Sequence, residues 1–569
     1  MSARRLATRL AAVLAASLVL ALSACATIPR SGAVVRGGSV AAQDNGFDQI
    51  DYHPNPPSDG ESQQDILNGF IDAAVSPAGG YQVARAFLSD SFRGEWDPDA
   101  SVTVDDAAQR TAPVPSGASE LSMSVTPVAF IDGAGDYRTA GSQAPVTLGY
   151  SFVKQHGQWR ISKAPNGIVI DAALFRNVFS SHALYFYSPD FRYLVPDLRW
   201  FPSSSASLAT RIVKALLAGP SPWLQDAVAT AFPKGTQLAA GSVVVQTGTA
   251  QVALNSVAAG ADQTTTVRMN QQLGESLTDA ASQVSLSIGG VQQDVSTVTQ
   301  AERDPSVSAN PLVLQNGKFG FLASSAFVAF NGIGPAIAAL HASAATVTAD
   351  GRTAAVLAGD AVYAVTASQS APVRIDARPD LLPPAVDNSD IVWSATTDPR
   401  TPFDVAAADG ATAQIKASWP DARSLVSFSV SRDGTRLAAL VRTEDGRAHL
   451  MVAGIVRDAR GHPTRIGAPV DIGELALSKG YALTWTDELT VAVLGASPQG
   501  GTAIISQALG DAAAAPQPGP DGGVGITGGN PAAQLWVRTA QGALETTAGT
   551  SWQQVAKGVD ILAVQQGRN

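Results

Sequence analysis

The chain has 569 residues, of which 45% are hydrophobic and 15% are charged, and its formal net charge is -10. This length and composition predict a globular protein of about three or four domains. The acidic balance argues against nucleic acid and anionic lipid headgroups as partners, because both are bound by basic patches. Cys25 is the only cysteine, so the chain cannot form an internal disulfide.

The N-terminus has the pattern of an export signal. Three arginines precede a largely apolar run of 13 residues, Leu10 to Leu22, whereas a transmembrane helix needs about 20 apolar residues. The next residues, Leu22-Ser23-Ala24-Cys25, resemble the lipobox of bacterial lipoproteins. This resemblance implies that residues 1–24 are a lipoprotein signal peptide and that Cys25 is the lipidation site, carrying palmitate. An ordinary signal peptide with an incidental cysteine is the alternative.

A lipid on Cys25 would hold the mature protein at the cell membrane, on its extracytoplasmic face. Cleavage after Ala24 removes three arginines and no acidic residue, so the mature chain is more acidic still. Residues 25–60 follow as a flexible linker, because prolines and glycines are frequent there and apolar periodicity is almost absent. We expect this segment to space the folded body off the membrane.

Residues 61–172 are predicted to form an α+β domain. Apolar residues recur at helical spacing before and after the Pro77-Ala78-Gly79-Gly80 break, which indicates two short helices. Strands follow, first around Val128 and Phe130, and then from Val146 to Phe152, with a turn at Gln155-His156-Gly157-Gln158. Helices followed by an antiparallel sheet are typical of this class. His156 is expected to be a solvated turn residue.

Residues 180–295 are predicted to be a second α+β domain. A strand at Ala183–Tyr187 precedes a helix that begins near Leu208 and is stopped by Gly219-Pro220. Short strands, another helix and a final strand are then expected, and the residues that indicate them are Val243–Val245, Val252–Leu254, Met269, Leu273, Leu277 and Val284–Ile288.

This second block carries a family resemblance. Ala183–Tyr187, Leu208–Pro220 and Gln251–Asn255 resemble the GerMN domain of sporulation and germination proteins and of actinobacterial lipoproteins. Together with the lipobox and the order of the domains, they make the whole chain similar to the LpqB family, which is associated with the MtrA–MtrB two-component system. The resemblance implies an accessory role beside a sensor histidine kinase, and it brings no catalytic residue with it.

Residues 305–569 are predicted to be an all-β propeller. Helical periodicity disappears after Pro311, and the stretch Thr346–Val356 is echoed by Ser429–Ala439, with the two Asp-Gly pairs 83 residues apart. That spacing is close to two blades of about 42 residues, so the region has room for about six. Hairpin turns at Gly359-Asp360, Asp445-Gly446 and Gln541-Gly542 fit four-stranded blades. The alternative is a pair of β-sandwiches.

No catalytic, metal or cofactor residue is predicted. The six histidines include no pair at metal-ligand spacing, and neither a Gly-x-Ser-x-Gly nor a His-Glu-x-x-His motif occurs. Gly523–Gly528 matches the dinucleotide fingerprint literally, but no strand is expected before it and no helix after it, so we interpret it as a loop. The spacing at Ser431-Arg432-Asp433-Gly434 resembles propellers of TolB type, which are binding modules, more than sialidases.

The sequence thus predicts a multidomain protein with an α+β N-terminal domain, an α+β GerMN-like domain and an all-β C-terminal propeller. The favoured function is a non-enzymatic regulatory binding protein whose partner is the extracytoplasmic domain of a sensor kinase. A cell-wall-binding structural protein and a glycan hydrolase remain as alternatives, because a sequence does not show which carboxylates lie close together. The propeller is expected to fold independently, with Trp393, Trp485 and Trp536 in its core.

Overall fold

The computed structural model describes residues 54–117, 119–141, 144–203, 207–295, 300–323, 326–407, 411–531, 533–549 and 551–566. Cys25, the signal peptide and most of the predicted linker lie outside these ranges. Residues 50–569 form one compact unit. Among the described residues, no helix is both long enough and apolar enough to cross a membrane.

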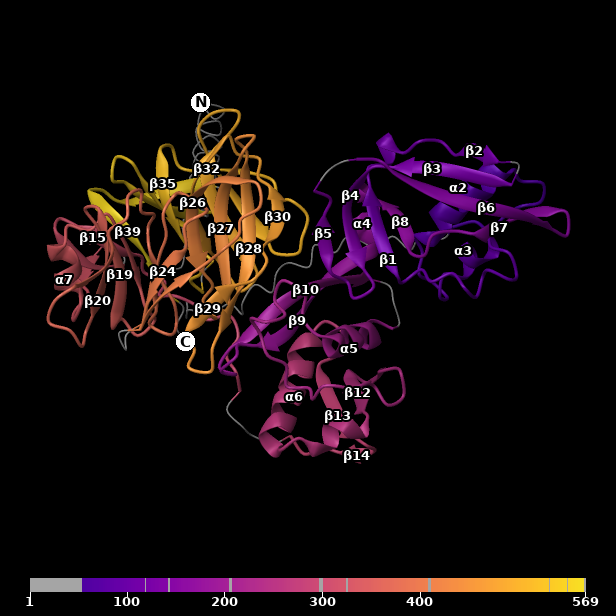
Figure 1. Ribbon diagram of the computed structural model, residues 1–569, viewed down its shortest axis with the longest axis horizontal. Helices are drawn as coiled ribbons and strands as arrows, with labels where there is room; N and C mark the ends of the chain where they lie inside the picture. Colours follow the sequence, from indigo (N-terminus) through magenta and orange to yellow (C-terminus); the bar gives the residue numbers. More distant parts are fainter. Residues whose placement is uncertain are drawn as a thin grey trace, which may run out of the picture. The chain divides into compact units, whose positions relative to one another are not determined.

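The N-terminal domain begins with two short helices (Figure 1), α2 Gln63–Ala74 and α3 Gln82–Ala86. Ser62 caps α2, because its hydroxyl accepts a hydrogen bond from the Asp65 amide and the Asp65 carboxylate accepts one from the Ser62 amide. The apolar face of α2 enters a core in which the rings of Phe70 and Trp96 meet edge to face, with their centroids 5.0 Å apart. The two helices expected from the periodicity are therefore confirmed.

Two four-stranded sheets complete this domain, in the orders β5-β4-β1-β8 and β2-β3-β6-β7. The strands are β1 Ser101–Asp105, β2 Val114–Gly117, β3 Glu120–Val125, β4 Pro127–Asp132, β5 Tyr137–Thr139, β6 Val146–Gln155, β7 Gln158–Lys163 and β8 Ile168–Asp171. A 3-10 turn, η1 Ala107–Gln109, follows β1, and α4 Ala172–Val178 follows β8. His156 is exposed in the β6–β7 turn with a φ of 51°, as predicted.

Alternation around Val128 and Phe130 predicts β4 correctly but does not show which face is buried. Phe130 is 42% exposed, while its neighbours Ala129 and Ile131 are fully buried. The larger side chain therefore lies on the solvent face of the strand, and the smaller alanine fits the core between the helices and the sheet.

The second domain starts with a long hairpin, β9 Phe179–Tyr187 and β10 Leu194–Pro202. A four-stranded sheet follows in the order β11-β12-β13-β14, with β12 and β13 parallel and joined by a crossover helix. Its elements are α5 Leu208–Ala218, β11 Val244–Gln246, β12 Thr249–Leu254, η2 Ser256–Gly260, α6 Gln263–Ser276, β13 Gln283–Ile288 and β14 Val291–Gln292. Every element predicted here is present, but β10 has no counterpart in the sequence prediction.

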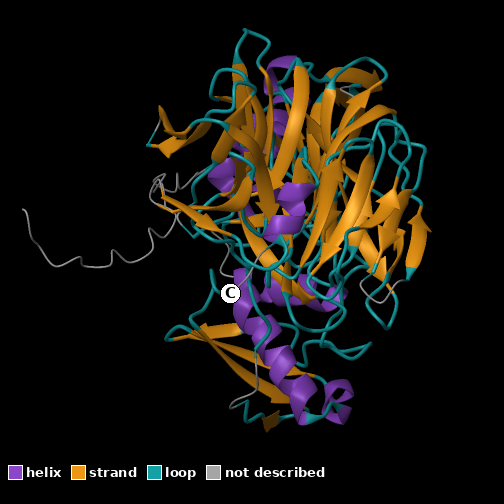
Figure 2. Ribbon diagram, turned by 90° about the vertical axis from the view of Figure 1, so that its left-hand side faces the viewer, coloured by secondary structure: helices purple, strands orange, loops and turns teal. Residues whose placement is uncertain are grey.

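Strands dominate the C-terminal region (Figure 2), where α7 Gly334–Ala339 is the one helix among the described residues. The first strands are β15 Leu312–Gln315, β16 Lys318–Ala323, β17 Ala326–Ala329, β18 Ala344–Val347, β19 Thr353–Ala358, β20 Ala361–Thr366, β21 Val373–Asp376, β22 Ala385–Val386, β23 Val392–Ser394, β24 Phe403–Ala406 and β25 Thr412–Ile415. Those that follow are β26 Ala422–Val430, β27 Arg436–Thr443, β28 Ala448–Arg457, β29 Pro463–Ile466, β30 Val470–Glu474, β31 Lys479–Trp485, β32 Thr490–Ala496, β33 Thr502–Ala508, β34 Gln517–Pro518, β35 Gly523–Thr527, β36 Trp536–Thr539, β37 Leu544–Ala548, β38 Ser551–Ala556 and β39 Val559–Gln565.

Pairing of these strands closes a propeller. Among the described residues they form six four-stranded blades, with β30 added to the blade that begins at β26. The last strand, β39, pairs antiparallel with β15 and so completes the first blade from the far end of the chain. The innermost strands β18, β22, β26, β31, β35 and β39 together line a central cavity of about 170 Å³. A closed ring leaves few exposed strand edges, which favours stability.

Two expectations for the propeller are wrong. Gly523–Gly528 is not a loop, because residues 523–527 form β35, the innermost strand of the last blade. Glycines suit this position, since a side chain at Gly523 would meet Val537 and Leu494 of neighbouring strands. Trp393 and Trp485 are buried as predicted. Trp536 is only partly buried, because it lies at the side of a smaller core cluster.

Candidate functional site

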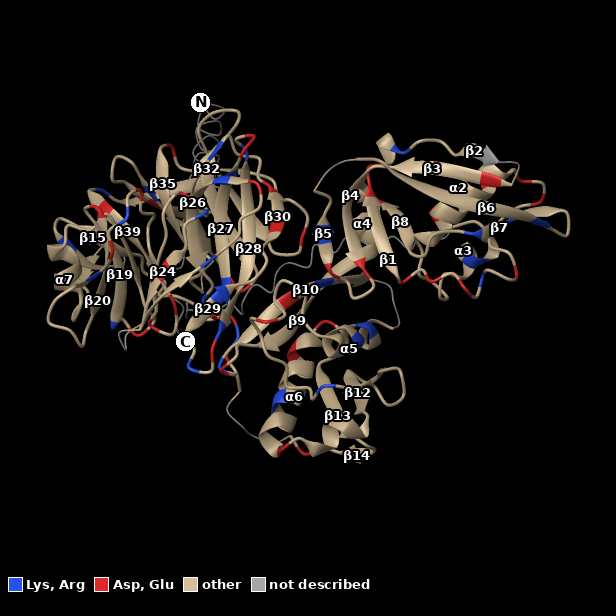
Figure 3. Cartoon of the chain, viewed as in Figure 1, with Lys and Arg blue, Asp and Glu red and all other residues tan. Residues whose placement is uncertain are grey.

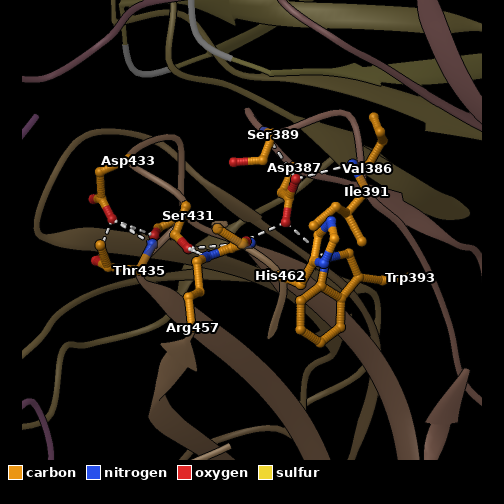
Figure 4. Close-up of polar contacts among 12 residues, drawn as sticks. Val386, Asp387, Ser389, Ile391, Trp393, Ser431, Asp433, Thr435, Arg457 and His462 are labelled. Atoms are coloured by element: carbon orange, nitrogen blue, oxygen red, sulfur yellow. Dashed lines mark hydrogen bonds and ion pairs between the residues drawn. The ribbon is translucent and has the colours of Figure 1, made fainter. Parts of the chain in front are cut away.

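The densest polar network in the propeller joins two neighbouring blades around Asp387 (Figure 4). The Asp387 carboxylate is fully buried and accepts hydrogen bonds from the amides of Ser389 and Ile391, at 2.9 and 3.1 Å. It also accepts one from the Trp393 indole at 3.0 Å and one from Arg457 at 2.6 Å. Arg457 lies on β28 and its guanidinium donates onward to the Gly434 carbonyl. The network therefore fastens one blade to the next.

Asp433 organises the adjoining turn. Its carboxylate accepts hydrogen bonds from the Ser431 hydroxyl at 2.8 Å and the Thr435 amide at 2.9 Å, and it pairs with Arg436. Burial by itself raises the pKa of this carboxyl, but the Arg436 charge and these hydrogen bonds outweigh burial and hold the pKa below its usual range. Ser431 donates to Asp433 and accepts from the Arg436 amide, at 3.1 Å, so its hydroxyl is engaged in the turn.

The polar contacts around Asp387 and Asp433 stabilise the fold and do not form a nucleophile–base pair. A nucleophile needs a base that removes its proton, whereas Ser431 donates to a carboxylate that a buried arginine already neutralises. Within the described ranges, no three His, Cys, Asp or Glu side chains lie close enough to hold a metal ion. The sequence prediction named no catalytic, metal or cofactor residue, and the polar groups of this network are committed to holding the fold.

A second polar cluster joins the GerMN-like domain to the propeller through the connecting segment. The Tyr185 hydroxyl donates to Glu488 at 2.6 Å, and Arg303 donates to the same carboxylate at 3.0 Å. Arg303 also lies over the Tyr185 ring, 4.6 Å from its centroid. Burial raises the pKa of Glu488, although the hydrogen bond from Tyr185 and the charge of Arg303 oppose the shift. Arg303 of the connecting segment is therefore in contact with both domains.

The third cluster lies where all three domains meet. Asp197 and Arg199 of β10 form an ion pair with a distance of 2.7 Å, and both side chains are at most 3% exposed. The Ser221 hydroxyl donates to Asp197 at 2.6 Å and lies 3.3 Å from Asp136 of the N-terminal domain. Burial raises the pKa of Asp136, against the effect of the nearby Arg199 charge. A polar seam thus connects the first two domains.

Beside this seam is a cavity of about 250 Å³ whose walls come from the three domains. Its residues are Asp136–Thr139 of the first domain, Pro196–Leu198, Pro222 and Trp223 of the second, and Ala468–Ile472, Leu489 and Leu509–Asp511 of the propeller. Polar contacts hold these walls together, because the Trp200 indole donates to the Gly510 carbonyl at 2.8 Å and Arg176 pairs with Asp511 at 2.7 Å. This cavity is the candidate ligand site of the molecule.

Sequence reasoning missed this site, because its residues come from segments far apart in the chain and form no motif. One local signal existed: Asp197 and Arg199 lie two positions apart within an otherwise apolar stretch. In a strand, such residues share a face and are expected to be paired when that face is buried. Cys25, the one site residue that was predicted, lies outside the described residues and stays a prediction.

Family models match three successive parts of the chain. Residues 56–176 match the N-terminal domain of Lipoprotein LpqB, and residues 317–562 match the Lipoprotein LpqB beta-propeller domain. Residues 183–294 match the model described as sporulation and spore germination. The α+β, GerMN-like and propeller fold classes are therefore all supported by known families.

Individual proteins agree with these matches. Lipoprotein LpqB of Bifidobacterium longum is 27% identical over 522 residues, which is 87% of each chain. Lipoprotein LpqB of Cutibacterium acnes is 32% identical over 305 residues, so this chain covers only about half (49%) of that relative. Among solved structures, TolB from Acinetobacter baumannii aligns with a TM-score of 0.32 and 10% identity, over 44% of this chain and 64% of that one. We draw no conclusion about function from a likeness at that level.

Proposed function

Because the chain belongs to the LpqB lipoprotein family by its N-terminal and propeller domains, we propose that it is a non-enzymatic binding protein that regulates a two-component sensor kinase. It is anchored at the extracytoplasmic face of the cell membrane by a lipid on Cys25. Its partner is the extracytoplasmic domain of an MtrB-like sensor histidine kinase, and its role is in cell envelope homeostasis.

The observation that carries this proposal is the match to a B. longum LpqB lipoprotein through all three domains. The physical setting supports it. A lipid on Cys25 would confine the protein to the membrane face that displays the sensor domain, which raises the effective concentration of the two partners for each other. Weak contacts between them would then be occupied. The Leu-Ser-Ala-Cys pattern supports the proposal of such an anchor.

The surface of the propeller is suited to binding a protein partner. Acidic and basic residues are mixed around its loops (Figure 3), so it presents charges of both signs to a partner. The buried Asp387–Arg457 pair joins two blades, and the buried Asp433–Arg436 pair stiffens a turn within one blade. A surface that is rigid before binding loses little conformational entropy when a partner docks.

The proposal is tested by crosslinking in intact cells, followed by identification of the proteins attached to the wild-type chain and to a Cys25→Ser variant. We expect the sensor kinase to be recovered with the wild type and to be reduced in the variant, whose palmitate labelling should also be lost. Recovery of glycan fragments without kinase would reject the regulatory role and favour the alternative of a wall-binding structural protein. Palmitate label that persists in Cys25→Ser would reject the anchor.

For the glycan hydrolase alternative we consider the two carboxylates at the candidate cavity that lie closest to one another, Asp136 and Asp197, since both lie within 3.3 Å of the Ser221 hydroxyl. Asp197 is 2% exposed, and its carboxylate is engaged by Arg199 and by the Ser221 hydroxyl, so it is not free to act as a catalytic acid or nucleophile. Glycosidases need two carboxyl groups that face the same bond of a bound sugar. We therefore expect no soluble fragments when the full chain is incubated with purified cell wall, and release of fragments would overturn the non-enzymatic assignment.

A further inference from the structure

The cavity between the three domains has a charge pattern that selects for a neutral ligand. Four carboxylates line it; three have an arginine within ion-pair distance, and the fourth has a histidine, which carries a charge only when it is protonated. The pairs are Asp136 with Arg138 at 3.0 Å, Asp197 with Arg199 at 2.7 Å, Asp511 with Arg176 at 2.7 Å, and Asp471 with His449 at 3.0 Å. Because three of the four acids have an arginine as counter-charge, the walls do not favour a strongly charged guest of either sign.

The same walls are rich in hydrogen-bonding groups. Carboxylates accept hydrogen bonds even when they are ion-paired, and each has about four lone-pair directions. Tyr137 also lines the cavity, and among the described residues its hydroxyl has no hydrogen-bond partner. Burial, and next the charge of Asp511, raise the pKa of Tyr137 to about 12. Its hydroxyl therefore stays protonated and is available both to donate and to accept.

Apolar surface lies beside these polar groups. Tyr137 and Trp223 line the cavity together with Pro196, Pro222 and Pro469. Flat, apolar faces next to ionised acceptors suit a molecule with hydroxyl groups around its edge and C–H groups on its face. The volume of about 250 Å³ is slightly below the range of roughly 300–1,000 Å³ that is usual for drug-sized ligands.

We propose that this cavity binds a single sugar residue, as a free monosaccharide or as the end of a glycan chain. The sugar would lie against Trp223 and Tyr137, and its hydroxyl groups would exchange hydrogen bonds with the Tyr137 hydroxyl. They would also donate to the carboxylates of Asp471 and Asp511, whose side chains are 44% and 20% exposed. Since the walls come from three domains, one bound sugar would contact all of them. The proposal is independent of the kinase partnership, because it concerns an internal cavity and needs no second protein.

The test measures binding to the full mature chain in detergent micelles by saturation-transfer difference NMR. The probes are N-acetylglucosamine and glucose as monosaccharides, chitotetraose as a glycan with a free end, and putrescine as a small cation. Saturation transfer to a monosaccharide is the expected result. Transfer to monosaccharides alone would assign a free sugar, and transfer to chitotetraose as well would assign a glycan end.

Two variants locate the binding. Ala468 lines the cavity and is exposed on the propeller loop before β30, so Ala468→Trp fills the space without entering the core and should abolish the signal. The control is Ala540→Trp, in an exposed turn of the propeller that does not line the cavity. Tyr137→Phe removes only the hydroxyl and should weaken binding roughly two- to tenfold, as expected for one neutral hydrogen bond. All three should melt like the wild type.

Several results would overturn the proposal. Saturation transfer to putrescine and to no sugar would show that the cavity selects for positive charge. Equal sugar binding by Ala468→Trp and the wild type, with unchanged melting of the variant, would place the sugar elsewhere on the molecule. The absence of transfer to any of the sugars at millimolar concentration would reject the sugar class.

Discussion

Two Asp-Gly turns of the propeller, at Asp350-Gly351 and at Asp433-Gly434, share one sequence pattern but have different surroundings. In the first, the Thr348 hydroxyl donates to Asp350 at 2.8 Å, and in the second the Ser431 hydroxyl donates to Asp433 at 2.8 Å. In both, the aspartate also accepts a hydrogen bond from the amide two residues later, Arg352 at 3.0 Å and Thr435 at 2.9 Å. The turn itself is therefore encoded locally.

The two turns differ in the burial of the aspartate and in the hydrogen bonds that the neighbouring side chains make. The Asp350 side chain is 51% exposed, whereas that of Asp433 is 4% exposed and paired with Arg436. Arg432 and Arg436 stand where the first turn has Ala349 and Thr353. The Arg432 guanidinium donates to the Gly528 carbonyl at 3.0 Å, and that of Arg436 donates to the Glu488 carbonyl at 2.8 Å. The Asp350 turn is thus exposed at the surface, whereas the arginines of the Asp433 turn form hydrogen bonds to other blades.

The largest expected effect is that of Asp433→Ala. Removing this carboxylate leaves Arg436 buried without its counter-charge, a change that costs about 3–5 kcal/mol in comparable sites. We expect a loss of that size in the free energy of opening of the propeller. Native-state hydrogen exchange of the β27 and β28 amides measures it, because a multidomain chain does not unfold in one step. A loss below about 1 kcal/mol would show that the buried pair contributes no more than a surface pair.

Lowering the pH weakens the same Asp433–Arg436 interaction, because it protonates the Asp433 carboxylate. The folded state holds the pKa of Asp433 below its usual range, and an unfolded aspartate titrates near 3.9. The stabilisation from this group is therefore present above about pH 4 and is lost as the pH falls through the folded-state pKa. We expect the stability difference between the wild type and Asp433→Asn to shrink below about pH 4 in acid-unfolding curves. A difference that stays constant down to pH 2 would contradict the linkage.

The contrast between the turns shows what the sequence can predict. The echo of Thr346–Val356 by Ser429–Ala439 gives the turns, the blade period and the number of blades, because these depend on local hydrogen bonds and strand length. It does not show that Asp433 is buried and Asp350 exposed. That difference depends on groups from other blades that are remote in the sequence. One of them is the Glu488 carbonyl, which accepts a hydrogen bond from Arg436.

The candidate cavity could not be predicted from the sequence for the same reason. Its three walls are about 60 to 330 residues apart along the chain, counting from Tyr137 to Leu198 and to Asp471. The one local signal, the spacing of Asp197 and Arg199, indicates a buried ion pair and not a ligand wall. The α+β and propeller classes were predictable, because each rests on periodicity within its own segment, as the α2 and β6 patterns show.

Alanine at the glycines of the two turns should have a smaller effect. Gly434 has a φ of 74° and Gly351 a φ of 70°, so each substitution is expected to cost about 1 kcal/mol through backbone strain. A Cβ at Gly434 would also lie 2.1 Å from the Asn388 amide oxygen, whereas at Gly351 the closest atom is Cζ of Phe330, at 2.8 Å. We expect Gly434→Ala to lower the melting temperature of the propeller more than Gly351→Ala. Equal shifts would mean that Asn388 moves aside freely.

The smallest effect is expected for Asp350→Ala, the counterpart of the Asp433 substitution. Asp350 and Arg352 are 4.0 Å apart with side chains 51% and 72% exposed, and such surface pairs contribute about 0–1 kcal/mol. The hydrogen bonds from Thr348 and Arg352 to this carboxylate are replaced by water when it is removed, because the turn is open to solvent. We expect a loss of at most about 1 kcal/mol, measured by hydrogen exchange of the β18 and β19 amides. A loss as large as that of Asp433→Ala would mean that the shared turn itself, and not the buried arginines, sets the stability of both blades.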